Sequence, residues 1–179
     1  ANPNVRRNAA TIFIDAFPMQ DPGLPLVELD ALLQRQFDAL GALLKDAAVS
    51  VRIVGVHGVF RVLALYWELI PPPTSAALLA TLTQQLAYDA SASTVRAAVV
   101  EGLKFLVAQA TSESCIAALR GGAKSPLAAI APLINDSSQR VRAATLDLLI
   151  ELSKVRGFSW QSVVKVDVLV TRLPLEPAS

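Results

Sequence analysis

The sequence predicts an all-α protein in which helical hairpins stack into a superhelix, and three observations support this. Four Val-Arg pairs lie at spacings of 46, 44 and 46 residues. Apolar residues within the copies follow helical spacing, and prolines or glycines separate one helical stretch from the next. The chain has 53% hydrophobic and only 17% charged residues, against roughly 25% charged in typical soluble domains. The four pairs are Val5-Arg6, Val51-Arg52, Val95-Arg96 and Val141-Arg142.

The copies also share their surroundings. Asp46, Asp89 and Asp136 precede the second, third and fourth pairs by five or six residues. A period of about 40 to 47 residues with helical patterning inside each unit is typical of HEAT and armadillo repeats. We therefore expect a right-handed α-solenoid of HEAT repeats, with residues 1–179 forming a single segment of a longer array.

Prolines, glycines and capping residues set the predicted boundaries. Pro3 after Asn2 predicts a helix start, and Pro18 predicts the end of that helix. Residues 163–168 alternate like a strand, but the repeat pattern predicts a helix from Ser159 to Leu173. The predicted units are a partial unit at 1–18, units at about 26–70, 74–109 and 112–155, and a partial unit at 159–173. Their predicted helices are 3–17, 27–45, 51–69, 75–88, 94–109, 112–120, 125–134 and 140–155, with a loop at 18–25.

A helical wheel places a narrow polar arc on the second helix of each unit. Second helices line the concave side of such solenoids, so these residues are expected to form a stripe along the inner surface. Acids outnumber bases on the stripe by five to two, which suits a peptide or protein partner better than phosphate. The acids are Asp15, Glu68, Glu101, Asp147 and Glu151, and the bases are Arg61 and Lys154. The candidate partner-binding residues are His57, Arg61, Glu68, Glu101, Asp147, Glu151 and Lys154.

Arginines mark a second candidate surface, because one follows the recurring valine in the first turn of each second helix. Stacking would place them along one edge, where free helix N–H groups favour a phosphate-contacting ridge. The alternative is that each arginine pairs with a loop acid, Asp46, Asp89 or Asp136, and ties adjacent units together. A fixed register inside a repeat favours this structural role. The candidate edge residues are Arg6, Arg7, Arg52, Arg96, Arg140 and Arg142.

Patterns for catalysis and metal binding are missing from the sequence. His57 has no nearby cysteine or acidic partner of the kind that a nucleophilic triad needs. One histidine and one cysteine, Cys115, cannot form a common zinc site. In the glycine-rich stretch 121–125 the lysine does not directly follow the glycine that a phosphate-binding loop requires. We therefore expect no catalytic residue, cofactor or metal, and no small-molecule substrate.

Charge and cysteine content narrow the partners and the compartment. The net charge of +1 provides no global field for nucleic acid or anionic membranes. The single cysteine cannot form an internal disulfide, which suits a reducing compartment. No uninterrupted apolar run reaches the length of about 18 residues typical of a membrane span. A soluble intracellular protein without a membrane partner is expected.

Two stretches are more specific than the general repeat pattern. The first is 8–22, with the loop Ala-Phe-Pro-x-x-Asp-Pro, and the second is 55–60, continued by Tyr-Trp-Glu-x-x-Pro-Pro at 66–72. Both resemble the HEAT-repeat, CAP-G type non-SMC subunit of the condensin II complex. Weaker matches at 86–89, in the Val141 helix and at 169–173 extend the likeness over essentially the whole chain, although 111–125 departs from the pattern.

The resemblance implies a non-enzymatic scaffold subunit in the nucleus and on chromosomes. Such a subunit binds a kleisin and through it the SMC ATPase subunits, contacts double-stranded DNA, and acts in mitotic chromosome condensation and segregation. DNA binding by this segment alone is expected to be weak or absent. Another HEAT-repeat scaffold is the alternative, such as a nuclear transport receptor or phosphatase regulatory subunit that binds basic peptides. A hydrolase or transferase is disfavoured by the missing residues.

Overall fold

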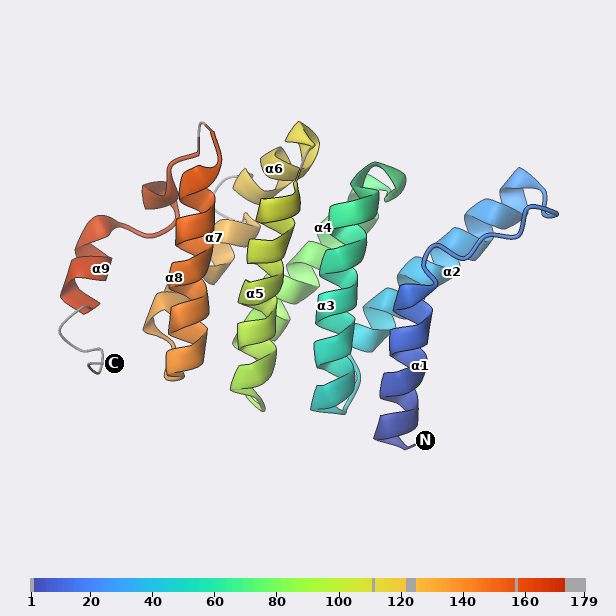
Figure 1. Ribbon diagram of the computed structural model, residues 1–179, viewed down its shortest axis with the longest axis horizontal. Helices are drawn as coiled ribbons and strands as arrows, with labels where there is room; N and C mark the ends of the chain where they lie inside the picture. The colour runs from blue at the N-terminus through green and yellow to red at the C-terminus, as the bar shows by residue number, and fades with distance from the viewer. Residues whose placement is uncertain (1, 111, 122–124, 157, 173–179) are drawn as a thin grey trace.

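The computed structural model describes residues 2–110, 112–121, 125–156 and 158–172, and every regular element in these ranges is helical (Figure 1). The predicted all-α class is therefore confirmed. The α-helices are α1 (Pro3–Asp15), α2 (Leu26–Leu44), α3 (Val49–Tyr66), α4 (Pro72–Ala80), α5 (Ser93–Gln109), α6 (Glu113–Arg120), α7 (Pro126–Ile130), α8 (Gln139–Lys154) and α9 (Val166–Arg172). Short 3-10 segments are η1 (Trp67–Leu69), η3 (Leu86–Tyr88), η5 (Ala131–Asn135) and η6 (Trp160–Ser162), and η2 (Thr81–Gln85) is π-helical.

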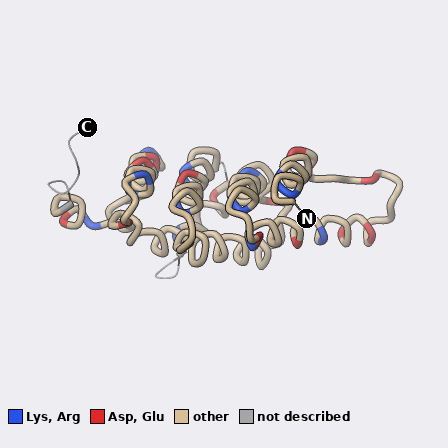
Figure 2. The backbone as a smooth tube through the Cα atoms, turned by 90° about the horizontal axis from the view of Figure 1, so that it is seen from below, with Lys and Arg blue, Asp and Glu red and all other residues tan. Residues whose placement is uncertain are grey.

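The helices form two layers in an elongated stack. In the first layer α1, α3, α5 and α8 stand side by side, and each contacts the next (Figure 1). The second layer consists of α2, α4 with η2 and η3, and α6 and α7 with η5, and it covers one face of the first (Figure 2). No described element covers the opposite face of the first layer. That face is where a partner can reach four helices at once.

Local signals at helix starts act as predicted. Asn2 caps α1, because its side chain accepts a hydrogen bond from the Asn4 backbone N–H at 2.9 Å, and Pro3 occupies the first turn. Ser125 caps α7 in the same way, accepting from the Ala128 N–H at 3.0 Å. The proline-rich stretch 18–25 is a loop, as predicted.

The predicted helix at 75–88 is less regular than its sequence suggests. It begins earlier, at Pro72, because the prolines occupy a first turn in which the missing N–H is not needed. It then changes to π and 3-10 geometry at η2 and η3. Thr81 and Thr83 donate their hydroxyl protons to the carbonyls of Ala77 and Leu79, at 3.0 and 2.8 Å. These bonds compete with the regular backbone ladder.

The predicted helix at 159–173 is divided in two. A turn of 3-10 helix, η6, is followed by α9, and the Ser162 hydroxyl donates to the Ser159 carbonyl at 2.6 Å where the first part turns. The strand-like alternation at 163–168 therefore does not form a strand. Leu173 lies outside the described residues.

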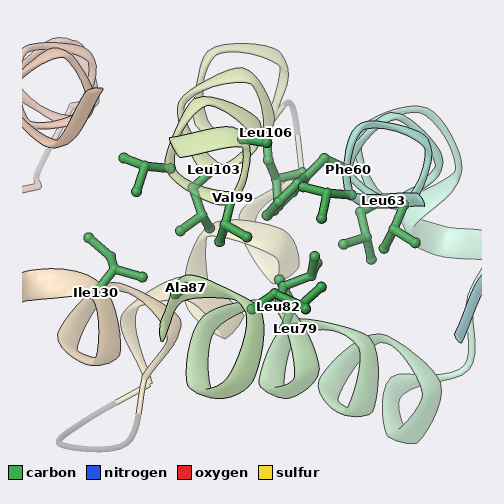
Figure 3. Packing of buried hydrophobic residues seen from close by; sticks show 14 of the residues in the cluster. Phe60, Leu63, Leu79, Leu82, Ala87, Val99, Leu103, Leu106 and Ile130 are labelled. Carbon is green, nitrogen blue, oxygen red and sulfur yellow. The ribbon is translucent and has the colours of Figure 1, made fainter. Parts of the chain in front are cut away.

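The core lies between the two layers and is continuous along the stack. Leu63 of α3 and Leu103 of α5 point toward the second layer, where Leu79 of α4 and Leu82 of η2 lie, and Phe60 of α3 points toward α5 (Figure 3). All five side chains are buried, and each contributes about 1.5 to 3 kcal/mol by leaving water. The apolar character of α3 and α5 follows from this arrangement, because both helices are packed against neighbours on several sides.

Two glycines let the first-layer helices approach closely. A Cβ on Gly58 of α3 would lie 2.2 Å from the Cδ1 atom of Ile14, and one on Gly102 of α5 would lie 2.0 Å from the Cδ2 atom of Phe60. Both glycines stand seven residues after the valine of a Val-Arg pair. At these two positions the missing side chain makes room for a large side chain from the preceding first-layer helix.

One segment has the length and composition of a membrane span. Val49–Leu69, which joins α3 and η1, has 21 residues and a mean hydropathy of 1.5, but half of it is buried inside the protein. Contacts with α1, α2 and α5 account for that apolar character. The segment is the central helix of the stack.

Candidate functional site

The arginine edge, which we define as Arg6, Arg52, Arg96 and Arg142, is a ladder of ion pairs between successive units. Arg6 binds the Asp46 carboxylate through two nitrogens, Nε and Nη2, each at 2.8 Å. Arg96 binds Asp136 in the same bidentate manner, at 2.8 and 2.9 Å. In both pairs the aspartate lies 40 residues further along the chain. Each pair thus joins one second helix to the loop of the next unit.

The ion pair between Arg52 and Asp89 also joins a first-layer helix to a following loop, but its geometry differs. Arg52 Nη2 lies 2.9 Å from Asp89 Oδ2 and donates to the Ser91 hydroxyl at 2.7 Å. The Asp89 carboxylate also accepts the Ser91 backbone N–H at 2.8 Å, which shapes the loop before α5. The side chains of this pair are only 11% and 9% exposed. Solvent screening of the pair is therefore weak.

The backbone carbonyl of each loop aspartate accepts a hydrogen bond from a second arginine. Arg52 donates through Nη1 to the Asp46 carbonyl at 2.8 Å, while the Asp46 carboxylate holds the arginine of the preceding unit. The bond recurs from Arg96 to the Asp89 carbonyl at 2.9 Å and from Arg142 to the Asp136 carbonyl at 2.9 Å. The loops before α3, α5 and α8 are thereby fixed from two sides.

Electrostatics agree with a structural role. The hydrogen bond from Arg6 is the main cause that lowers the pKa of Asp46 from 3.8 to about 2, and the Ala48 N–H contributes further. The hydrogen bond from Arg96 likewise lowers the pKa of Asp136. Burial alone would raise the pKa of Asp89, but hydrogen bonds from Ser91 and Ala92 and the charge of Arg52 outweigh it, so this pKa is also lowered. These carboxylates stay ionised at neutral pH.

The structure therefore shows the pairing that the structural interpretation predicts, between Arg6, Arg52 and Arg96 and the three loop aspartates. Arg142 is 8% exposed and is held by loop carbonyls. The two remaining edge candidates differ from these four. Arg7 is exposed, and Arg140 points to another surface, where it pairs with Glu101 at 3.1 Å.

The open face is the name we give to a set of exposed and partly exposed charged residues, with His57, on the first-layer helices and on η1, which continues α3. Its acids and bases form pairs across neighbouring helices: Arg61 with Asp15 at 2.6 Å, Lys104 with Asp147 at 3.1 Å and Arg140 with Glu101 at 3.1 Å. Lys154 pairs within α8 with Glu151 at 2.8 Å. Figure 2 shows charges of both signs on these helices. The open-face residues are Asp15, His57, Arg61, Glu68, Glu101, Lys104, Arg140, Asp147, Glu151 and Lys154.

The excess of acids over bases predicted for the stripe is smaller on this surface, because the sequence reasoning left out two cations that belong to it. Lys104 and Arg140 raise the number of bases from two to four against the same five acids. Arg140 stands one residue before the recurring valine. With that valine at 0° on the helical wheel, Arg140 lies at about 260°, inside the predicted polar arc of roughly 220° to 280°. Lys104 lies near 180°, outside the arc, and reaches Asp147 through its long side chain.

A groove of about 480 Å³ runs between α5 and α8 on the open face. Phe105, which is 41% exposed, lines it together with alanines, and the Lys104–Asp147 and Glu101–Arg140 pairs border it. An apolar floor between exposed ion pairs can receive an apolar side chain of a protein partner. Its charge is balanced, so it does not select for a basic peptide.

Glu68 is the acid of the open face that is held by hydroxyl groups. Its Oε1 atom accepts hydrogen bonds from Ser112 at 2.6 Å and Ser114 at 3.0 Å, and these bonds lower its pKa. Ser114 also accepts a hydrogen bond from Trp67 Nε1 at 2.8 Å. The cluster joins η1 to the start of α6 across more than 40 residues of sequence. Neither serine is among the site residues predicted from the sequence.

The described residues contain no group of three or more His, Cys, Asp or Glu side chains that could hold a metal ion. Cys115 is buried, and burial together with the charge of Glu68 raises its thiol pKa from 9.0 to about 11. A thiol of this kind is protonated at neutral pH and is a poor nucleophile. His57 is exposed on α3. Of the glycine-rich stretch, residues 122–124 lie outside the described part of the chain.

Comparison with known proteins identifies relatives of the chain, which the geometry alone does not. No family model matches the chain, and no solved structure matches it with significance. The curated protein "Condensin-2 complex subunit G2" of Homo sapiens is 34% identical over 172 residues, which cover 96% of this chain. The proteins of the same name from Xenopus laevis and Mus musculus are 34% and 31% identical over 175 residues each. The chain spans only 14 to 15% of the length of these relatives.

Fold and surfaces define an all-helical protein in which largely buried ion pairs join first-layer helices to neighbouring loops, and a second, solvated set of ion pairs lies on one face. The similarity to condensin-2 complex subunit G2 extends over nearly the whole chain and shows the family. The chain belongs to the condensin-2 complex subunit G2 family, and it corresponds to one segment of that subunit. The resemblance predicted from the motifs at 8–22 and 55–72 is confirmed.

Proposed function

We propose that this chain is a scaffold segment of a non-enzymatic condensin II subunit, built as a right-handed α-solenoid of HEAT repeats. The observation that carries the proposal is the identity of 31 to 34% to condensin-2 complex subunit G2 over 96 to 99% of the chain. The stacked first layer and the ladder of inter-unit ion pairs support it, since both recur at the period of the Val-Arg pair. The proposed units are those of the sequence, at 1–18, 26–70, 74–109, 112–155 and 159–173.

The proposed role is recognition within a complex that acts on chromosomes in the nucleus. The kleisin subunit is the proposed direct partner, and it would link the segment to the SMC ATPase subunits. We assign the contact to the open face, because its ion pairs are exposed and can be exchanged for pairs with a partner at little cost. The groove beside Phe105 offers the apolar part of that contact.

Contact with double-stranded DNA is proposed to be a minor property of the segment. On the arginine edge Arg52 and Arg96 hold aspartates, so their donors are not available to phosphates. Arg7 and Arg140 are exposed and remain able to contact a duplex. We expect affinity in the non-specific range of about 10⁻⁴ to 10⁻⁶ M, strongly dependent on salt.

Crosslinking of the assembled complex tests the protein contact. The full-length protein that contains this segment is co-expressed with the kleisin and SMC subunits, purified through a kleisin tag and treated with a lysine-reactive crosslinker. Lys104 and Lys154 of the open face are expected to crosslink to the kleisin, whereas Lys45 at the end of α2 serves as a second-layer control. Failure to co-purify, or crosslinks confined to the control lysine, would contradict the proposal.

Titration of a duplex at two salt concentrations tests the DNA contact. The double substitution Arg7→Glu and Arg140→Glu should weaken binding and reduce the salt slope by about one for each lost phosphate contact. Unchanged affinity and slope would remove both residues from the proposed contact.

A further inference from the structure

A second groove lies where η1 meets the second layer, away from the groove beside Phe105. It has a volume of about 510 Å³ and lies between the end of the α3–η1 segment, the α4–η2 segment and the start of α6. Trp67, Ile70 and Leu79 provide apolar walls, and Glu68 provides the charge. The volume is large enough for one long side chain together with the backbone of a short peptide segment.

Glu68 is the acid of the open face that makes no ion pair with any residue the structure describes. Asp15, Glu101, Asp147 and Glu151 each have a cationic partner within 3.1 Å. Glu68 is instead oriented by the hydroxyl groups of Ser112 and Ser114, which stabilise the carboxylate without neutralising its charge. A fixed, un-neutralised carboxylate at the wall of an apolar groove attracts a cation and repels an anion.

The apolar walls specify the rest of the ligand. The indole of Trp67 is fixed by the hydrogen bond from its Nε1 atom to Ser114, so carboxylate and aromatic ring are held by the same serine. Tryptophan is the aromatic side chain that attracts ammonium and guanidinium groups most strongly. Aliphatic stems of lysine and arginine pack on apolar surface while their charged ends reach a polar partner.

We propose that this groove binds a lysine or arginine side chain presented by a peptide segment of a partner protein. The aliphatic stem lies along Ile70 and Leu79, and the cationic end meets Glu68 beside Trp67. The inference rests on the groove alone and not on the proposed place of the chain in condensin II. A phosphate-bearing ligand does not fit, because Glu68 would oppose it.

Tryptophan fluorescence of the 179-residue chain tests the proposal. The chain has two tryptophans, so Trp160→Phe leaves Trp67 as the single reporter at the groove. The probe is a capped pentapeptide with a central lysine flanked by leucines. The same peptide with norleucine at the centre keeps the stem and removes the charge, and an arginine version tests the other cation.

The lysine and arginine peptides should shift the Trp67 emission in a saturable way. The norleucine peptide should bind at least about tenfold more weakly, because it lacks the hydrogen bond of the charged group. Glu68→Gln should reduce the affinity for lysine to that for norleucine. Glu28→Gln, which changes an exposed carboxylate on α2, should leave both affinities unchanged. Ala76→Leu, which fills the groove from α4, should weaken all three peptides.

Circular dichroism confirms that each variant retains its helices before the titration. Three results would overturn the proposal: no saturable response to the lysine or arginine peptide at millimolar concentration, equal affinity for lysine and norleucine, or a Glu68→Gln variant that binds lysine as tightly as the parent chain.

Discussion

The arginine edge and the open face both contain ion pairs that join one first-layer helix to a neighbouring element, but the pairs differ in burial. The side chains of Arg96 and Asp136 on the edge are 14% and 8% exposed, whereas those of Lys104 and Asp147 on the open face are 41% and 58% exposed. The presence of an ion pair between neighbouring elements therefore does not distinguish a structural pair from one that a partner can replace. The exposed fraction of the two side chains distinguishes them.

Energetics explain why the two surfaces have different uses. Breaking a buried ion pair leaves an uncompensated charge and costs about 3 to 5 kcal/mol. An exposed pair contributes only about 0 to 1 kcal/mol, because water and salt screen it. A partner can therefore replace the pairs of the open face, while the arginine edge holds the units in place.

The largest effect is expected from Arg96→Met. The substitution leaves the buried Asp136 carboxylate without its bidentate partner and should lower the free energy of unfolding by about 3 to 5 kcal/mol. Urea unfolding followed by circular dichroism measures the change. A loss below about 1 kcal/mol would place the edge in the same class as the open face.

A smaller loss is expected from Gly102→Ala. The added methyl group would meet the ring of Phe60 and force α3 and α5 apart, at a cost of about 1 to 3 kcal/mol. Gly41→Ala, at a helical glycine with nothing near the new carbon, is the matched control and should stabilise or leave unfolding unchanged. Equal effects at the two glycines would show that the packing between first-layer helices is looser than described.

Acid should weaken the ion pair between Arg6 and Asp46. Because the folded pKa of Asp46, about 2, lies below its ordinary value of 3.8, its stabilisation is complete above pH 4 and is lost as the pH falls toward 2. Arg6→Met removes the main cause of the shift, so the pKa of Asp46 should rise toward its ordinary value. Carbon-13 NMR titration of the Asp46 carboxyl group measures it. An unchanged pKa in the variant would contradict the pairing.

The smallest effect is expected on the open face itself. Lys104→Met should change the free energy of unfolding by less than about 1 kcal/mol, and added salt should diminish the difference. The same substitution should weaken kleisin binding if the groove beside Phe105 is the contact. A stability loss comparable with that of Arg96→Met would abolish the distinction between the two surfaces.

Features set by neighbours in sequence were predictable from the chain alone. The start of α1 at Pro3, the cap at Ser125 and the period of the Val-Arg pair depend on local chemistry, and the structure has them where the sequence places them. Arg140 was predictable in principle, since its wheel position lies within the polar arc.

Features set by stacking were not predictable in this way. The contact of Glu68 with Ser112 and Ser114 joins residues more than 40 positions apart, and no pattern in either stretch marks the other. The partner of each edge arginine is the aspartate of the following unit, so choosing it requires knowing how units stack. The π-helical η2 arises where threonine hydroxyls compete for backbone carbonyls, which helix periodicity does not reveal.

A pair of double-mutant cycles, one on Arg96 and Asp136 and one on Lys104 and Asp147, tests the central claim most directly. Urea unfolding of the single and double variants gives the coupling energy of each pair. We predict a coupling of about 1.5 to 3 kcal/mol for the buried edge pair and about 0.5 kcal/mol or less for the open-face pair. Couplings of equal size would contradict the account, because burial would then not separate the residues that hold the stack from those that face a partner.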